Sequence, residues 1–289
     1  MELSPGLSSV CTLANKFKDI TAANVLQHIS GLEGLKEDEV LQIIGPPRRN
    51  PVIRHDSTED GDESTAPQYL VYPVLWSSVD LQHITDKPCL IDFGESFEAA
   101  QPPEELGTPG PYRSPELILD NKAGFGSDIW ALACTLFEIR TGRKLFSPFD
   151  DDDTSYLEAM TQVLGKLPEP WWSITWTDRR RLYKDEVDEH GRVMDVAEPQ
   201  AVEKADDEGA PRRTVKVHPS VAEGARSMID KLAPGVWYLS DERPNGDRHR
   251  DMPRHEMELF ADLLGKMLEY EPEKRLAASA ALAHEWFNL

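Results

Sequence analysis

The pattern of apolar and polar positions predicts a chain built mainly from helices, with a minor β element. The strongest helical signal is residues 127–140, where apolar side chains cover nearly the whole helix surface, as in a buried central helix. We expect Ser127 to cap its first turn and Gly142 to end it, because glycine readily adopts the left-handed conformation that follows a helix. Further helices are expected at residues 37–44, 154–164, 255–270 and 277–286.

Two short apolar runs are typical of strands and predict only a small amount of sheet. They are residues 69–76, interrupted by Pro73, and residues 88–93. Two long polar stretches lack apolar periodicity, and we expect them to be mobile inserts. The expected organisation is an atypical lead-in at residues 1–16 followed by one domain at residues 17–289, with the mobile inserts at 45–68 and 177–219.

Composition narrows the class of protein. The 289 residues include 31 Lys and Arg and 52 Asp and Glu, and the resulting net charge of −21 disfavours direct binding to nucleic acid. No run of about 18 apolar residues is present, so no membrane span is expected. The cysteines Cys11, Cys89 and Cys134 are widely separated and form no CxxC motif. This favours a reducing, intracellular location in the cytoplasm, the nucleus or both.

Three short strings place chemically useful residues in a defined order. In the first, Asp19 precedes Asn24 by five positions, just ahead of an apolar stretch. In the second, residues 92–94 read Asp-Phe-Gly at the end of an expected strand. The third string is YRSPE at residues 112–116, which precedes the expected central helix at 127–140.

In this order the strings resemble the signature of the eukaryotic protein kinases, which is a catalytic loop with Asp and Asn, then DFG, then APE. The family's D-x-W helix start is matched by residues 128–130, and Arg275 resembles the arginine that pairs with the APE glutamate. Details at residues 90–96, 112–117 and 165–172, together with the long insert between Asn24 and Asp92, are most similar to the SR-protein kinases and their fungal relatives.

The resemblance implies a mainly helical, protein-kinase-like C-terminal lobe that transfers the γ-phosphate of ATP to protein serine or threonine. Asp19 would act as the catalytic base that accepts or orients the substrate hydroxyl proton. Asn24 and Asp92 would hold Mg²⁺, a hard cation for which oxygen ligands are suited. The adenine would lie on Leu26. The resemblance therefore assigns the ATP and metal site to Asn24, Leu26, Asp92, Phe93 and Gly94.

Other residues have supporting roles by the same resemblance. Glu116 and Arg275 would form a buried ion pair that fastens the activation segment, and losing one partner of such a pair is costly. Asp128 would anchor the catalytic loop from below. Gly94 would let the loop that carries Asp92 turn.

The residues before Asp19 depart from the family pattern. Only 18 residues precede it, and the sequence contains no GxGxxG or VAIK-like string. The N-terminal lobe that normally covers ATP is therefore expected to be largely absent, with activity impaired. Two alternatives remain: a catalytically inactive kinase-like module that docks Arg-rich peptides, and a truncated gene product.

An acidic run follows the expected central helix. It consists of Asp150, Asp151, Asp152 and Asp153. By resemblance to the SR-protein kinases, this run would dock a basic, Arg/Ser-rich protein substrate through Asp–Arg contacts. The alternative is a solvated loop without a partner. The sequence does not indicate the oligomeric state.

Overall fold

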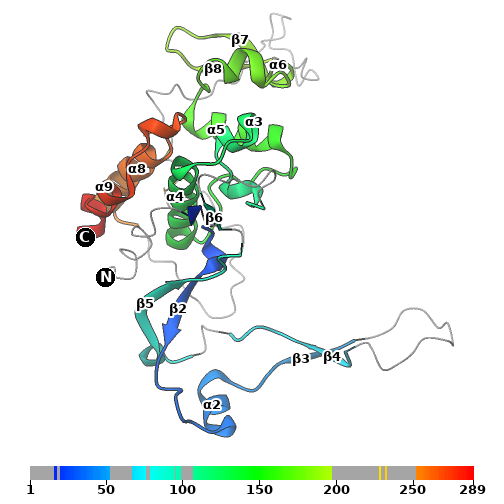
Figure 1. Cartoon of the computed structure of the whole chain (residues 1–289), viewed down its shortest axis with the longest axis vertical. Coiled ribbons are helices and arrows are strands. Elements are labelled where there is room, and N and C mark those ends of the chain that lie inside the picture. Colours follow the sequence, from blue (N-terminus) through cyan, green and yellow to red (C-terminus); the bar gives the residue numbers. More distant parts are fainter. Residues whose placement is uncertain are drawn as a thin grey trace, which may run out of the picture. The chain divides into compact units, whose positions relative to one another are not determined.

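The computed structural model describes residues 16–17, 20–52, 67–75, 79–94, 96–98, 107–196, 228, 232 and 252–289. The chain divides into two compact units (Figure 1). The larger unit comprises residues 1–26 and 90–289, and the smaller comprises residues 27–89. Within the described ranges, no helix is both long and apolar enough to cross a membrane.

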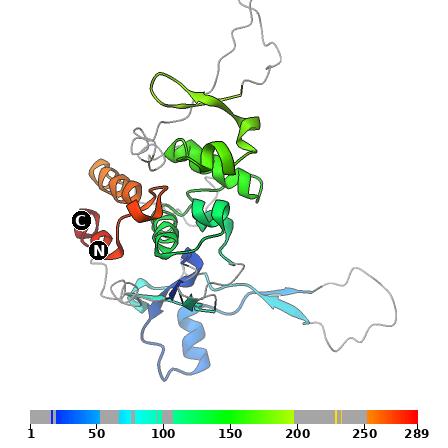
Figure 2. The same cartoon turned by 45° about the horizontal axis from the view of Figure 1, so that its top comes forward.

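The larger unit is built around the long helix α4, Phe125–Thr141. Its side chains at Trp130, Ala133 and Phe137 are completely buried, as the nearly all-round apolar pattern predicts. Helix α8 packs along α4, and Figure 2 shows the two side by side. The remaining helices of this unit are α3 (Pro115–Asp120), α5 (Asp153–Leu164), α6 (Arg179–Leu182), α8 (Arg254–Met267) and α9 (Ala278–Leu282).

The ends of α4 test the predicted caps. The prediction that Ser127 caps the helix is wrong, because α4 begins at Phe125 and Gly124 occupies the N-cap position. Ser127 lies one turn inside the helix, and its hydroxyl accepts a hydrogen bond from the Gly124 amide at 3.3 Å. The predicted end is confirmed, since Gly142 adopts the left-handed conformation with φ +72°.

Residues 177–196 are structured, although the sequence predicts that a mobile insert begins there. They form α6 and an antiparallel pair of strands, β7 (Tyr183–Val187) and β8 (Val193–Asp195). Tyr183 and Val193 are buried, and the Tyr183 ring lies 5.6 Å from that of Trp172. Two buried apolar residues among many charged ones give no periodic signal. The sequence pattern therefore does not predict this hairpin. Residues 197–219 lie outside the described residues.

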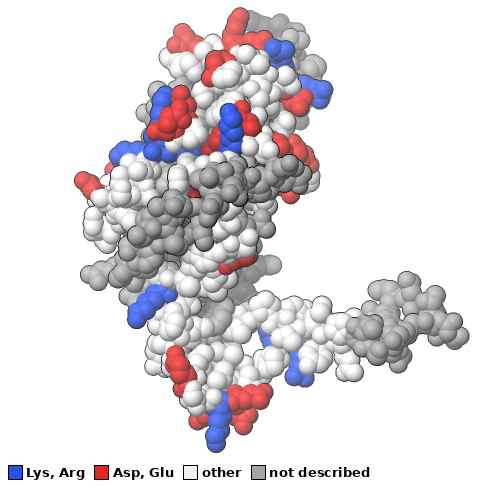
Figure 3. Space-filling view, viewed as in Figure 1, with Lys and Arg blue, Asp and Glu red and all other residues white. Residues whose placement is uncertain are grey.

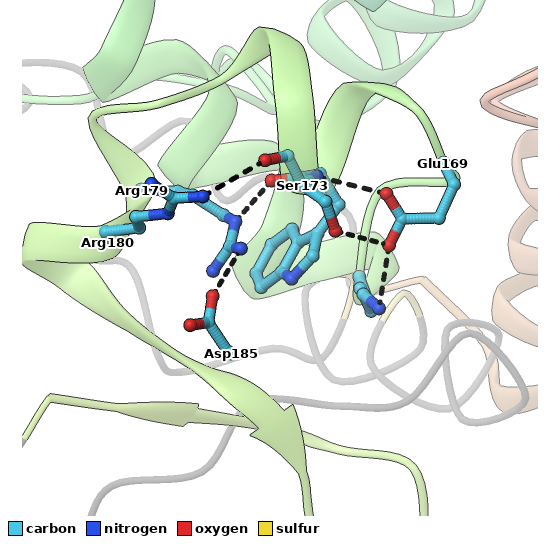
Figure 4. A network of polar contacts seen from close by, with 7 residues as sticks. Glu169, Ser173, Arg179, Arg180 and Asp185 are labelled. Carbon is cyan, nitrogen blue, oxygen red and sulfur yellow. Dashed lines mark hydrogen bonds and ion pairs between the residues drawn. The ribbon is translucent and has the colours of Figure 1, made fainter.

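A polar network holds the turn that precedes α6 (Figure 4). The buried guanidinium of Arg179 lies over the Trp172 ring and donates hydrogen bonds to the Trp172 carbonyl and to the Asp185 carboxylate. The Glu169 carboxylate accepts hydrogen bonds from the Ser173 amide at 3.0 Å and from the Ser173 hydroxyl at 2.8 Å. Side-chain contacts to the backbone thus order a segment that lacks apolar periodicity.

The strands of the described residues form four separate two-stranded sheets, in agreement with a minor β element. The expected strand at residues 69–76 is shorter in the structure and ends before Pro73. The sheets pair β1 (Lys16–Phe17) with β6 (Phe97–Glu98), β2 (Val25–Ile29) with β5 (Ile84–Leu90), β3 (Arg49–Pro51) with β4 (Tyr69–Val71), and β7 with β8. Short helical turns occupy η1 (Ala22–Asn24), η3 (Leu81–His83), η4 (Gly110–Tyr112), η5 (Trp171–Thr175), η7 (Pro272–Lys274) and η8 (Glu285–Asn288).

The smaller unit has almost no core of its own. It contains the expected helix α2, Glu37–Ile44, but no residue of this helix is buried. Among the described residues from 27 to 89, Val79 is the one buried hydrophobic side chain. The apolar side chains of α2 are at most partly buried, and those of β4 are exposed. The expected mobile insert at residues 45–68 contains β3, while residues 53–66 lie outside the described residues.

Candidate active site

Two segments distant in sequence meet at the predicted metal site in the larger unit. Asn24 ends the turn η1, and its carbonyl oxygen accepts a hydrogen bond from the Ile91 amide at 2.9 Å. Because Asp92 directly follows Ile91, the Asn24 amide and the Asp92 carboxylate extend from neighbouring backbone positions. The fold therefore brings together the two chain segments that carry the residues assigned to Mg²⁺ by the sequence.

The backbone turns sharply at Asp92. Its φ angle is +60°, in the left-handed region that residues other than glycine seldom occupy. The sequence predicts that Gly94 supplies this freedom, but the positive φ belongs to Asp92 and not to Gly94. Aspartate tolerates this conformation better than most residues, and such outliers concentrate at functional sites. A Cβ atom at position 94 would lie 3.5 Å from Asp92 Oδ1, an ordinary van der Waals contact, so space alone does not require glycine there.

The donors at this position fit Mg²⁺. Asn24 supplies an amide oxygen and Asp92 a carboxylate oxygen, both hard ligands, and Asp92 is exposed. Magnesium usually keeps several waters and binds one or two protein carboxylates together with substrate phosphates. A dense cage of protein ligands is therefore not required. The described residues indeed contain no group of three or more His, Cys, Asp or Glu that could hold a metal ion.

Apolar side chains adjoin this pair and are open to solvent. Leu26 is 47% exposed, Ile91 37% and Phe93 47%. Leu26 lies two residues after Asn24 in β2, where the resemblance places the surface beneath adenine. Exposed apolar side chains next to the predicted metal ligands are suited to the planar base of a nucleotide whose phosphates reach the metal.

The predicted base Asp19 lies outside the described residues, but its neighbours are described. Phe17 pairs with Phe97 in the sheet formed by β1 and β6, so the chain before Asp19 runs beside the chain that follows Gly94. Ile20, directly after Asp19, is buried. The described chain therefore reaches Phe17 on one side of Asp19 and Ile20 on the other.

Helix α4 supports this loop through Thr135. Its hydroxyl donates a hydrogen bond to the Ile20 carbonyl at 2.9 Å, and Thr135 is 1% exposed. Sequence reasoning missed this residue; the available signal was a hydroxyl within the apolar run of residues 129–137. Asp128, the predicted anchor, lies in the first turn of α4, and its anchoring role stays a prediction.

The predicted ion pair between Glu116 and Arg275 is present. It is bidentate, with Nη1 to Oε1 and Nη2 to Oε2 both at 2.7 Å, and both residues are buried. The Arg275 guanidinium also donates to the carbonyls of Glu269 and Tyr270 and lies 5.0 Å from the Trp130 ring centre. The first turn of α3 is thus fastened to the chain that follows α8.

The acidic run after α4 has contacts within the chain. Asp152 caps helix α5, accepting hydrogen bonds from the Ser155 amide at 3.1 Å and the Ser155 hydroxyl at 2.7 Å. The bond from the Ser155 hydroxyl, followed by the bond from the Ser155 amide, holds the pKa of Asp152 below its ordinary value. Asp153 pairs with Arg113 at 3.1 Å. Capping and local ion pairing therefore account for part of this acidity.

Tyr156 completes the contacts of the acidic run. Its hydroxyl donates a hydrogen bond to Asp151 Oδ1 at 2.7 Å. Burial, followed by this contact with Asp151, raises the pKa of Tyr156 to about 12. Tyr112 is tied in a similar way, because its hydroxyl donates to the Glu138 carboxylate. Burial and that contact raise the pKa of Tyr112, so its phenol stays protonated.

Comparison with known families decides the assignment. The family described as "Protein kinase domain" matches residues 81–287. This chain belongs to the protein kinase family. The match includes Asp92 and both partners of the Glu116–Arg275 ion pair, so the kinase-like reading of these positions rests on more than short strings.

Curated kinases match over much of the chain. The serine/threonine-protein kinase AFC3 of Arabidopsis thaliana is 28% identical over 199 residues, covering 69% of this chain and 40% of the relative. The serine/threonine-protein kinase SRPK of Physarum polycephalum is 29% identical over 180 residues, covering 61% and 32%. The dual specificity protein kinase CLK1 of Mus musculus is 27% identical over 198 residues, covering 68% and 32%. The chain spans less than half the length of these relatives. The similarity therefore supports an SR-protein-kinase-like character for the matched region alone.

Proposed function

We propose that the chain is the catalytic lobe of a serine/threonine protein kinase of the SR-protein-kinase type. The observation that carries this proposal is the backbone hydrogen bond between Asn24 and Ile91, which pairs the chain at Asn24 with the residue directly before Asp92. Mg²⁺ held there would neutralise charge on the phosphates of ATP during phosphoryl transfer. The kinase names of the relatives support the same reaction.

Each residue of the predicted site has a defined role in this proposal. Asp19 orients the substrate hydroxyl and accepts its proton. Asn24 and Asp92 bind the metal, and Leu26 lies beneath the adenine. Phe93 contributes apolar surface beside these two metal-binding residues. Positioning and charge stabilisation of this kind supply most of the catalysis in phosphoryl transfer.

The substrate and setting are part of the proposal. A protein rich in Arg and Ser would be attracted by the acidic side chains around Asp150 and Asp153, in a chain of net charge −21. Such a reaction takes place inside the cell, in the cytoplasm or nucleus. We expect weak activity from the 289 residues alone, because the sequence holds no glycine-rich string to cover the phosphates.

A phosphorylation assay tests this function. The purified chain is incubated with Mg²⁺, labelled ATP and a synthetic Arg-Ser repeat peptide. Label should appear on peptide serine with the wild type and disappear with Asp92→Asn, and it should persist with Asp38→Asn, a control at an exposed position of α2. Peptide binding without phosphorylation by the wild type would instead favour the inactive docking module. Equal phosphorylation by the wild type and Asp92→Asn would contradict the assigned site.

A further inference from the structure

The hairpin formed by β3 and β4 in the smaller unit exposes apolar side chains on both of its faces. Tyr69 is 41% exposed, Leu70 59%, Val71 56% and Tyr72 51%. An isolated two-stranded hairpin is only marginally stable in water, because one pair of strands cannot bury its own apolar surface. The near absence of a core in the described part of this unit makes the exposure more costly. A partner that covers the hairpin would therefore stabilise it.

The register shows which backbone groups of the hairpin remain available. The Val52 amide donates to the Gln68 carbonyl at 3.1 Å, and the Tyr72 amide donates to the Arg48 carbonyl at 2.9 Å. Hydrogen-bonded pairs alternate along an antiparallel ladder. The polar backbone groups of Tyr69 therefore point away from the partner strand, and so do those of Val71.

The two outer edges of the hairpin differ. On β3, the outward positions are Arg49 and Pro51, and proline has no N–H to donate. On β4, Tyr69 and Val71 each offer both an N–H and a carbonyl. Among the described residues, no backbone hydrogen bond reaches these four groups and no third strand joins the sheet. The edge of β4 is therefore the one suited to an added strand.

We propose that this edge of β4 pairs with β4 of a second copy of this chain. The two strands run antiparallel around a two-fold axis at Leu70, so that Tyr69 of each copy is hydrogen-bonded opposite Val71 of the other. The result is a four-stranded sheet with Pro51 on both outer edges. Because proline blocks those edges, the pairing closes at two copies and does not continue into a fibre.

The distribution of charge fits a second copy. Residues 67–75 contain no charged side chain, whereas the whole chain has a net charge of −21. Figure 3 shows basic and no acidic side chains on the described part of the hairpin. The basic residues Arg48 and Arg49 stand at its open end, stacked on Tyr72 and Tyr69.

The two-fold arrangement places no like charges opposite each other along the paired strands, because β4 of each copy is uncharged. Each hydrogen-bonded pair of Tyr69 with Val71 is repeated by the axis.

Sedimentation and cross-linking of the full chain test the proposal. The wild type should shift with concentration from 32.6 kDa to twice that mass. Val71→Pro removes an outward N–H of β4 and should abolish the shift. Arg49→Pro, which removes the outward N–H of β3, should leave it unchanged, with circular dichroism confirming that both variants fold. A wild type that stays a single copy, or equal dissociation of both variants, would overturn the proposal.

A cysteine at the axis gives an independent readout. In the proposed sheet, Leu70 of one copy lies opposite Leu70 of the other as a non-hydrogen-bonded pair. Their Cα atoms would be about 4.5 Å apart, within reach of a disulfide. In a chain with Cys11 and Cys89 changed to Ser, Leu70→Cys should form a covalent dimer under mild oxidation. Asn50→Cys on β3 should not. Cross-linking through Asn50→Cys and not through Leu70→Cys would contradict the assigned edge.

Discussion

The Glu116 carboxylate has a partner at each oxygen. Oε1 accepts hydrogen bonds from Arg275 and from the Ser127 hydroxyl, the latter at 2.7 Å, and Oε2 accepts from Arg275. These additional hydrogen bonds help to offset the cost of removing both charges from water. Ser127 thus contributes through Glu116 in addition to its contact with the helix start.

Removing one charge of this pair should be costly. We expect Glu116→Gln and Arg275→Met each to lower the free energy of unfolding by about 3–5 kcal/mol, because the other charge stays buried without a partner. The double variant should lose clearly less than the sum of the two. Urea denaturation measures all three, and fully additive losses would contradict the coupling.

An exposed ion pair provides the control for this experiment. Arg254 pairs with Glu258 on α8, and the two side chains are 71% and 50% exposed. Water already solvates both charges, so Arg254→Met should leave the denaturation midpoint nearly unchanged. A large shift for this variant would mean that removal of any arginine destabilises the chain.

At the scale of elements, the turn η4 and the helix α5 are in very close contact. A Cβ atom added to Gly110 would lie 2.2 Å from the Tyr156 ring. Tyr156 cannot easily withdraw, because it is buried and its hydroxyl is bonded to Asp151. Position 110 therefore requires glycine for reasons of space.

Two glycine substitutions should have opposite effects. Gly110→Ala should destabilise the chain by roughly 1–3 kcal/mol through overpacking. Gly265→Ala, in the last turn of α8 with nothing within 4 Å of the new Cβ, should stabilise it by about 0.5–1 kcal/mol. Thermal unfolding compares them. Tyr156→Leu should restore part of the loss at Gly110, and a Gly110→Ala variant as stable as the wild type would refute the contact.

The helices were predictable where one local rule dominates. The end of α4 follows from Gly142, and α2 was predicted at its observed bounds because Gly45 and Pro46 stop it. The start of α4 was misplaced, since a glycine N-cap gives no side-chain signal. The β7–β8 hairpin was missed because its order comes from contacts with distant tryptophans, which no local pattern reveals.

At the scale of the whole molecule, the order of the motifs predicted the family correctly. The segments of Asn24 and Asp92, on either side of the smaller unit in sequence, are joined by the backbone bond from Ile91 to Asn24, and their shared metal site stays a prediction. The left-handed conformation at Asp92 and the support from Thr135 depend on the folded backbone, so no string of residues indicated them. The exposed edge of β4 likewise emerged only from the register of the hairpin.

The most direct test of the central claim is the affinity of the 289-residue chain for ATP with and without Mg²⁺, measured by calorimetric titration. The account predicts binding that requires Mg²⁺ and weakens at least about tenfold in Asp92→Asn, a loss of about 1.4 kcal/mol. Asp150→Asn should bind as the wild type does. Absence of MgATP binding, or binding that neither Mg²⁺ removal nor Asp92→Asn changes, would contradict a nucleotide site at Asn24 and Asp92.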